Sequence, residues 1–174
     1  GTRLQASAGI ADSPDGHYGD MTVLAGSLLE RDNPRLRRIL VDSAADPVHW
    51  LESLGVTFAG PYEEMPHKVP RMHVALPNSR SYIYWLEKRC RALGVEILTG
   101  VRATTLVTQE GRVCGVEATV DGVDIRFEGG AVILSTGDYS ASPELKARYL
   151  PTCVGIDAIN ERSTGDGHEM ALRE

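Results

Sequence analysis

The segment from residue 101 to residue 137 limits most strongly how this chain folds. Its first part contains three runs in which apolar and polar residues alternate, "VRATTLVTQ", "VCGVEATV" and "VDIRFEG", and these are separated by "EGR" and "DG". Alternation with a period of two is typical of strands with one buried face, and short connections that contain glycine are typical of tight hairpins. We therefore predict a three-stranded antiparallel meander.

Two further runs look like strands of another kind. "AVILSTG", residues 131–137, is continuously apolar and ends in glycine, which favours a buried strand of a parallel sheet followed by a loop that faces a ligand. "VEILTG", residues 95–100, predicts a short strand as well. Together with the helices described next, these runs indicate an α/β fold.

The run "DNPRLRRILVDSAADPVHWLESLG" has the start and stop signals of a helix. Asp32 or Asn33 is placed to cap its N-terminus, Pro34 occupies the first turn and Gly55 ends it. Leucines, isoleucine and valine recur there at helical spacing and predict one apolar face. Pro47 lies inside the pattern, so we predict a kink or a split into two helices.

A second helix is predicted from "SRSYIYWLEKRCRALG". Ser79 or Ser81 is placed to cap it, and Gly94 is placed to end it. We expect its apolar aliphatic side chains, Ile83 and Leu93 among them, to face the interior.

The remaining segments show no regular pattern. Residues 56–79 carry four prolines and predict an extended functional loop with at most one short strand. Residues 1–31 are rich in small and polar types, with a short helix expected near residues 21–29, and make a poor candidate for core.

Composition excludes several classes of protein. At 174 residues, 42% hydrophobic and 24% charged, the chain is typical of one globular domain. The net charge of −6 is spread along the chain with no basic and aromatic cluster, so we expect no nucleic-acid partner. The apolar runs are shorter than the roughly 20 residues that cross a bilayer. Three cysteines without a C-x-x-C pair indicate a reducing compartment or have no redox role, and we expect a cytoplasmic location.

Three short motifs have both a ligand interpretation and an ordinary one. "SAGI" and "STGDYS" permit close approach to a ligand, or they are plain turns. "TGDG", residues 164–167, places a carboxylate at a helix start, where it suits a ribose or ribityl hydroxyl or simply belongs to a cap. His17 and His73 are candidates for a proton donor or a carboxylate contact, or are solvated loop residues. "HEMAL" lacks the second histidine of a zinc motif, so no metal site is predicted.

Taken in order, these segments resemble the flavoprotein family that contains fumarate reductase and succinate dehydrogenase flavoprotein subunits, aspartate oxidase, urocanate reductase and ketosteroid dehydrogenases. "ASAGIADSPDGHYGD" is similar to its "GGI" and "DSPE" segments, and "AADPVHWLESLGVTF" to its "WLESLGV" helix. "GRVCGVEA", "AVILSTGDYSASPELKARYLP" and "STGDGHEMALRE" are similar to its "GRV.GV.a", "aVILATGGFs" and "NTGDGI.MA" stretches.

The resemblance implies a partial Rossmann-like FAD-binding domain with an antiparallel meander. Residues 1–174 would be its middle portion, without the G-x-G-x-x-G unit and the later capping domain. FAD is the implied cofactor, and a small carboxylate is the implied substrate of the full-length protein, which would exchange hydride with a C=C or CH–CH unit. The chain alone is expected to be inactive. The alternatives are a non-catalytic flavoprotein-derived binding module, or an enzyme like aspartate oxidase or ketosteroid dehydrogenase.

The resemblance also implies cofactor contacts from the first part of the chain and from the first meander strand. Ala8, Gly9 and Ile10 would lie against the isoalloxazine, with their backbone amides near its reactive edge. Arg102 and Ala103 match the strand-end backbone position that pairs with adenine.

Further implied contacts come from the last forty residues. Thr136 and Gly137 match the "ATGG" contact to the cofactor, and Asp166 matches the acid of "TGDG" that accepts a hydrogen bond from it. Two departures stand out. Asp138 replaces the second glycine of "ATGG", so that turn must be reshaped or must avoid a positive φ, and Ala8 replaces the first glycine of "GGI". No catalytic residue is predicted within the chain.

Overall fold

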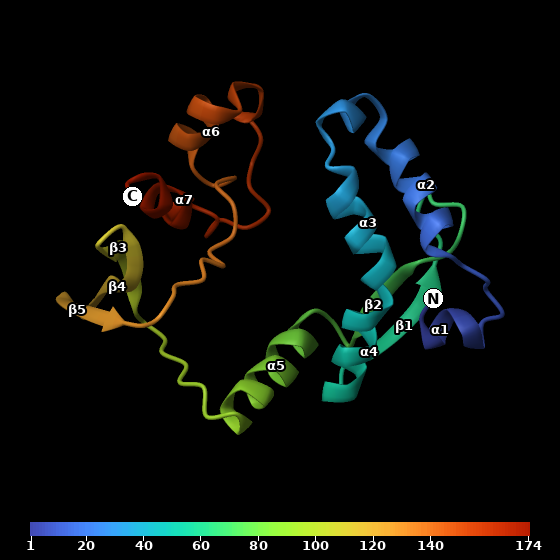
Figure 1. Cartoon of the computed structure of the whole chain (residues 1–174), viewed down its shortest axis with the longest axis horizontal. Coiled ribbons are helices and arrows are strands. Elements are labelled where there is room, and N and C mark those ends of the chain that lie inside the picture. Colours follow the sequence, from blue (N-terminus) through green and yellow to red (C-terminus); the bar gives the residue numbers. More distant parts are fainter. The chain divides into compact units, whose positions relative to one another are not determined.

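The computed structural model describes residues 1–174 and divides into two units, Gly1–Ile97 and Leu98–Glu174. Figure 1 shows that helices and strands occur in both. The first unit has a two-stranded sheet in the order β1-β2, and the second has a three-stranded sheet in the order β3-β4-β5. Helices and strands are mixed as predicted, and all strand pairs are antiparallel.

The first unit is largely helical. Its helices are α1 (Arg3–Ser7), α2 (Pro14–Ala25), the 3-10 helix η1 (Gly26–Arg31), α3 (Pro34–Ser43), α4 (Ala45–Leu54) and α5 (Arg80–Ala92). A helix was expected only near residues 21–29, whereas α1, α2 and η1 cover most of residues 1–31. Side-chain caps at Thr2 and Ser13 start α1 and α2 despite the small residues. Gln5 and Asp20 of these helices are buried.

The predicted split into two helices is confirmed, but its position differs. α3 begins after Asn33, whose side chain accepts hydrogen bonds from two backbone amides of the first turn, and α4 ends at Gly55 with φ +116°. The break falls at Ala44 and not at Pro47. A proline ring clashes with the carbonyl four residues earlier, here Ser43, and is tolerated within a first turn, so the helix breaks ahead of the proline.

The proline-rich segment contains two strands, where at most one was expected. β1 (Thr57–Tyr62) pairs with β2 (Met72–Leu76), and Phe58 lies opposite Ala75. Pro61 falls where the register is irregular, which is how a strand tolerates a residue without an amide hydrogen. The core of this unit forms on the pair. Its members are Val56, Phe58 and Ala75, with Leu4, Val48, Leu51, Tyr82 and Trp85 packed around them.

The cap of α5 differs from the prediction. The side chain of Asn78 accepts a hydrogen bond from the first helical amide, whereas neither Ser79 nor Ser81 caps the helix through its side chain. Gly94 follows the end of the helix with φ +74°, as predicted for a stop signal.

The predicted inner faces of the helices were partly wrong. Leu36 of α3 is 62% exposed and Ile83 of α5 is 66% exposed. The face of α5 that packs on the core carries Tyr82 and Trp85, and Trp85 lies so close to Gly55 that an added Cβ would approach the indole to 2.6 Å. Aromatic side chains bury more area than the aliphatic ones at the next positions, so they decide which face turns inward.

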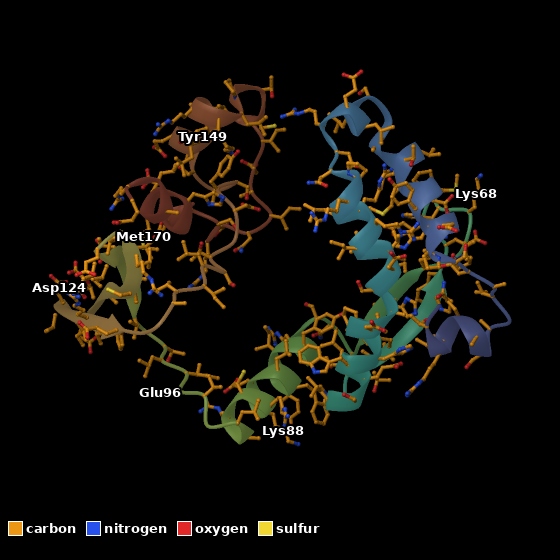
Figure 2. All side chains as sticks on the ribbon, viewed as in Figure 1. Lys68, Lys88, Glu96, Asp124, Tyr149 and Met170 are labelled. Carbon is orange, nitrogen blue, oxygen red and sulfur yellow. The ribbon has the colours of Figure 1, made fainter.

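The second unit contains the predicted meander. Its strands are β3 (Arg102–Gln109), β4 (Arg112–Val120) and β5 (Val123–Glu128). Glu110 and Asp121, each followed by glycine, adopt positive φ in the two connections, as tight hairpin turns require. The helices are α6 (Pro143–Tyr149), the 3-10 helix η2 (Pro151–Cys153) and α7 (Asp166–Leu172). α7 lies against β3, and Figure 2 labels its buried residue Met170.

Two predicted strands do not form. Residues 95–100 and 131–137 have no ladder partner, and Ile133 is 89% exposed. A parallel strand needs neighbours for its amide and carbonyl groups, and all five strands of this chain are paired in the two antiparallel sheets. Neither apolar run therefore becomes a buried strand here. No helix of the structure combines the length and the apolar character needed to cross a bilayer.

Candidate functional site

Asp166 and Arg102, two of the predicted contacts, meet in the second unit. Asp166 is the first residue of α7, and Thr164 Oγ1 donates a hydrogen bond to its Oδ1 at 2.8 Å. Arg102 Nη2 donates to the other oxygen at 3.2 Å. The Asp166 side chain is 42% exposed, so the lone pairs left over are open to a ligand.

The turn before Asp166 requires glycine. Gly165 has φ +81° and precedes the helix as its N-cap. A Cβ there would overlap Leu145 and come within 2.8 Å of the Tyr139 side chain. The backbone is therefore pressed against α6 and the loop before it, which sets the direction in which α7 starts.

Thr136 and Gly137 lie beside the start of α7. A Cβ on Gly167 would overlap the Thr136 side chain, and Gly137, with φ +77°, lies against the buried Ser163. The motifs "STG" and "TGDG", about thirty residues apart in sequence, are thus adjacent. They border one open hollow, which is lined by Leu134, Ser135, Thr136, Gly137, Gly167, His168 and Ala171.

The turn that contains Asp138 avoids a positive φ at this residue, which is one of the two outcomes expected from its replacement of glycine. Gly137 takes the positive φ, and Asp138 does not have one. The Asp138 carboxylate accepts a hydrogen bond from the Ser140 amide at 2.7 Å. Hydrogen bonds from Ser140 lower the pKa of Asp138, so it is ionised at neutral pH. An acid is accommodated there because it closes a local turn through its own side chain.

Ala103 follows Arg102 on β3 and pairs with Ala118 of β4. Its position at the beginning of a strand agrees with the expected backbone contact, and its small side chain is half-buried. That this backbone pairs with adenine stays a prediction.

In the first unit, Ala8, Gly9 and Ile10 form the end of α1. Gly9 has φ +68°, its amide donates to Ala6 O at 3.1 Å, and the Ile10 amide donates to Gln5 O at 2.9 Å. This is the Schellman arrangement that ends many helices. The Ala8 amide also bonds within the helix. The backbone amides of the turn are therefore already hydrogen-bonded to carbonyls of α1. Ala8 and Gly9 instead present exposed apolar surface to a ligand.

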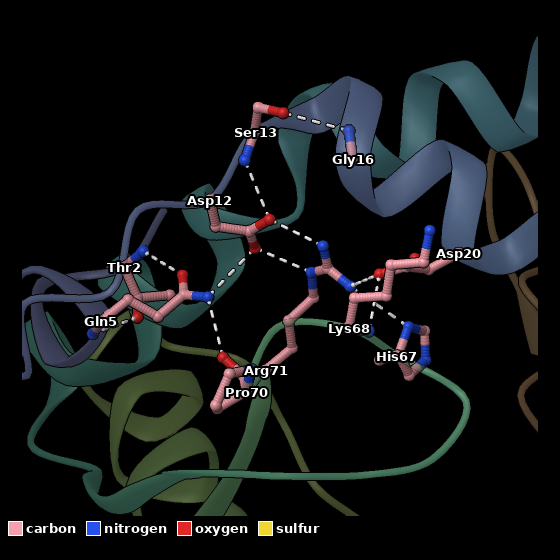
Figure 3. Close-up of polar contacts among 10 residues, drawn as sticks. All are labelled: Thr2, Gln5, Asp12, Ser13, Gly16, Asp20, His67, Lys68, Pro70 and Arg71. Carbon is pink, nitrogen blue, oxygen red and sulfur yellow. Dashed lines mark hydrogen bonds and ion pairs between the residues drawn. The ribbon is translucent and has the colours of Figure 1, made fainter.

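A buried ionic cluster lies next to this turn, and the sequence interpretation missed it (Figure 3). Arg71 Nε and Nη2 each donate to one oxygen of Asp12 at 2.7 Å, and Nη1 donates to Asp20 Oδ2 at 2.7 Å. The three side chains are between 6% and 11% exposed. Nothing in the sequence pairs Arg71 with carboxylates more than fifty positions away.

The cluster is ionised throughout. Burial raises the pKa of Asp12, but hydrogen bonds from Arg71 and Gln5 outweigh that effect and hold the pKa at about 2. The hydrogen bond from Arg71 lowers the pKa of Asp20, and the hydrogen bond to Asp12 raises the pKa of Arg71. A cation between two carboxylates satisfies all three groups in a site that water reaches poorly.

The two histidines named as candidates have structural surroundings. His73 Nδ1 donates to Arg71 O at 2.7 Å, and its Nε2 lies 2.7 Å from Thr2 Oγ1, so both ring nitrogens are engaged. Burial and then the Arg71 charge lower the pKa of His17, which is therefore neutral at pH 7. His17 packs edge-on against His67. A proton donor needs a free protonated nitrogen, so the engaged ring of His73 and the lowered pKa of His17 do not suit that role.

Comparison with known proteins identifies the family. The model of the FAD binding domain matches residues 1–174. The chain belongs to this FAD-binding domain family. A probable fumarate reductase of Shewanella frigidimarina is 29% identical over 98% of the chain and 30% of its own length. An NADH:fumarate oxidoreductase of Klebsiella pneumoniae is 25% identical over 99% of the chain and 19% of its own length.

Among solved structures, the open conformation of a flavocytochrome c3 fumarate reductase matches 99% of the chain and 31% of its own, with a TM-score of 0.88 and 27% identity. The chain thus has the fold of a segment of this flavoenzyme. The chain spans about a third or less of the length of these proteins.

Proposed function

We propose that this chain supplies part of the FAD site of an oxidoreductase that exchanges hydride with a C=C or CH–CH unit of a small carboxylate. One observation carries the proposal: Thr136, Gly137 and Gly167 line one open hollow of the second unit. Asp166, which is bonded to Arg102, directly precedes Gly167 in the chain. The family match and the relatives described as fumarate reductases support it. Residues 1–174 are then the middle portion of one FAD-binding domain.

The residues that line the hollow, together with Asp166 and Arg102 at the start of α7, fit a hydroxyl-bearing cofactor. Asp166 has acceptor capacity left and suits a ribityl or ribose hydroxyl, because a hydroxyl donates to a carboxylate whereas a phosphate is repelled by one. The backbone at Gly137 and Gly167 carries no Cβ, so a cofactor is able to approach it closely. Arg102, held by Asp166, adds donors for an electronegative atom of the cofactor.

The turn Ala8–Ile10 of the first unit, taken by itself, fits a flat part of FAD. Ala8 and Gly9 are exposed and small, and Ile10 is half-buried, which suits a flat aromatic ring. Because the amides of this turn bond within α1, the contact with the isoalloxazine would come from apolar surface. FAD supplies the hydride chemistry when bound, and the residues named here bind and orient it.

The test is substitution of Asp166 in the complete protein in which this chain occurs. Asp166→Asn keeps the shape of the side chain and removes its charge. Loss of one charge-assisted hydrogen bond of about 1.5 kcal/mol corresponds to FAD affinity roughly 10-fold weaker. FAD binding to apoprotein is measured by quenching of flavin fluorescence. Glu169→Gln is the control, because Glu169 lies on the same helix and its exposed side chain pairs only with Arg173.

Two results are decisive. A wild-type protein that takes up no FAD contradicts the proposed function. Equal FAD affinity for Asp166→Asn and wild type removes Asp166 from the site.

A further inference from the structure

The turn Ala8–Ile10 is tied down on both sides by side chains that bond to each other. Gln5 precedes the turn and Asp12 follows it, and Gln5 Nε2 donates to Asp12 Oδ2 at 3.0 Å. Gln5 is 3% exposed and also receives a hydrogen bond from the Thr2 amide. The backbone between Gln5 and Asp12 therefore forms a closed loop with the turn at its tip.

Arg71 joins this loop to the rest of the unit (Figure 3). It holds both oxygens of Asp12, and the carbonyl of its neighbour Pro70 accepts from Gln5 Nε2 at 3.0 Å. Arg71 directly precedes β2, whose Ala75 belongs to the hydrophobic core. The position of the turn is thus set by one guanidinium that is anchored to the core sheet.

The third guanidinium nitrogen of Arg71 connects the loop to a second element, α2. Nη1 donates to Asp20 of α2, and Asp20 also accepts from the Lys68 amide at 3.0 Å. One planar group therefore spans Asp12 after the turn and Asp20 in the next helix. A lysine carries the same charge but has no planar fork, so it cannot hold both oxygens of Asp12 and also reach Asp20 in this geometry.

We propose that Arg71 is a positioning residue for the flavin-contacting turn, acting through Gln5 and Asp12. It places Ala8 and Gly9 without touching the cofactor. This inference rests on the proposed function, in which the turn lies against the isoalloxazine.

The experiment uses the complete FAD-loaded protein and the variant Arg71→Lys. The variant keeps a cation between the two carboxylates, so the fold is expected to survive while the turn loses its fixed place. We expect FAD affinity to fall at least 5-fold and the visible absorption and circular dichroism bands of the bound flavin to shift. Arg38→Lys is the matched control, because Arg38 also bonds two carboxylates, Asp15 and Asp42, at the exposed surface.

Two further variants separate the possible failures. Ala8→Leu adds bulk at the exposed tip and probes the turn directly. Gln5→Met removes the hydrogen bonds to Asp12 and Pro70 while leaving Arg71 on Asp12, and it replaces Arg71→Lys as the test if that variant does not fold. The same loss of affinity and the same band shifts in Gln5→Met support the inference.

The outcomes are distinct. If Ala8→Leu weakens FAD binding but Arg71→Lys and Gln5→Met bind like wild type with unchanged flavin bands, the positioning role is overturned and the proposed function stands. If Ala8→Leu also has no effect, the turn does not contact the flavin and the inference falls, while FAD uptake by the wild-type protein still decides the proposed function.

Discussion

The two units each contain an arginine bonded to a carboxylate near a predicted cofactor contact, and the two pairs differ in burial. The side chains of Arg71 and Asp12 are 11% and 9% exposed, whereas those of Arg102 and Asp166 are 77% and 42% exposed. A buried pair is costly to break, because each partner would be left as an uncompensated charge, whereas an exposed pair is solvated either way. The first pair therefore holds backbone in place, and the second leaves its carboxylate available to a ligand.

The second unit holds its contact residues by another means. Gly167 lies directly on Thr136, and Gly165 lies on Leu145 and Tyr139, so the loop and α7 are located by close backbone packing. In the first unit, by contrast, the charged side chains of Arg71 and Asp12 hold the turn Ala8–Ile10 in place. The comparison predicts that charge substitutions disturb the first unit more, and that added volume disturbs the second.

The largest effect is expected from Arg71→Met. Removal of the cation leaves Asp12 and Asp20 buried without a partner, which costs about 3–5 kcal/mol of the free energy of unfolding. Both tryptophans, Trp50 and Trp85, belong to the first unit, so urea unfolding followed by tryptophan fluorescence reports on this unit alone. Arg38→Met at the surface is the control and is expected to cost less than about 1 kcal/mol. Equal losses of unfolding free energy in the two variants would show that the buried cluster is no more important for stability than an exposed ion pair.

The next effect is expected from Gly167→Ala. Alanine normally stabilises a helix relative to glycine, but here its Cβ would overlap Thr136, so we expect a net loss of about 1–3 kcal/mol. Hydrogen exchange of the α7 amides measures it. Gly130→Ala is the matched control, because a Cβ at Gly130 meets nothing within 4 Å. Unchanged protection in Gly167→Ala would show that packing does not locate α7.

Lowering the pH is expected to reduce the stability of the first unit, because Asp12 becomes protonated and loses its ion pair with Arg71. Its folded-state pKa of about 2 lies below the ordinary 3.8, so its contribution is present above pH 4 and is lost as the pH falls from about 4 to 2. The contribution is about 1–2 kcal/mol. The midpoint of urea unfolding, followed by tryptophan fluorescence, is measured across this range. Asp12→Asn should flatten the decrease, and an equally steep decrease in that variant would assign the effect to other carboxylates.

The smallest effect on stability is expected from Arg102→Gln. An exposed ion pair contributes about 0–1 kcal/mol, so the unfolding of the second unit, followed by hydrogen exchange of the β3 amides, should hardly change. Any effect should be seen in FAD binding, because Asp166 loses the group that orients it. A loss of stability as large as that in Arg71→Met would remove the contrast between the two pairs.

Local signals predicted the elements whose determinants lie close together in sequence. The meander follows from alternation and from the turns at Glu110 and Asp121, and α3 follows from Asn33 and Pro34. The motifs "STG" and "TGDG", each matched to a cofactor contact, prove to be adjacent in the structure. The prediction of a buried strand at residues 131–137 was wrong, since apolar character shows only that a segment prefers burial and says nothing about whether a partner strand exists.

The sequence by itself determined where α3 begins, where α4 and α5 stop and where the hairpins of the meander turn, because caps, turns and glycine conformations depend on neighbours a few positions away. Only the tertiary structure decided that Arg71 pairs with Asp12 and Asp20, that the strands of the proline-rich segment pair, and that Arg102 meets Asp166. These contacts join residues 10 to 64 positions apart, and their strength comes from burial and geometry that exist only after the chain has folded.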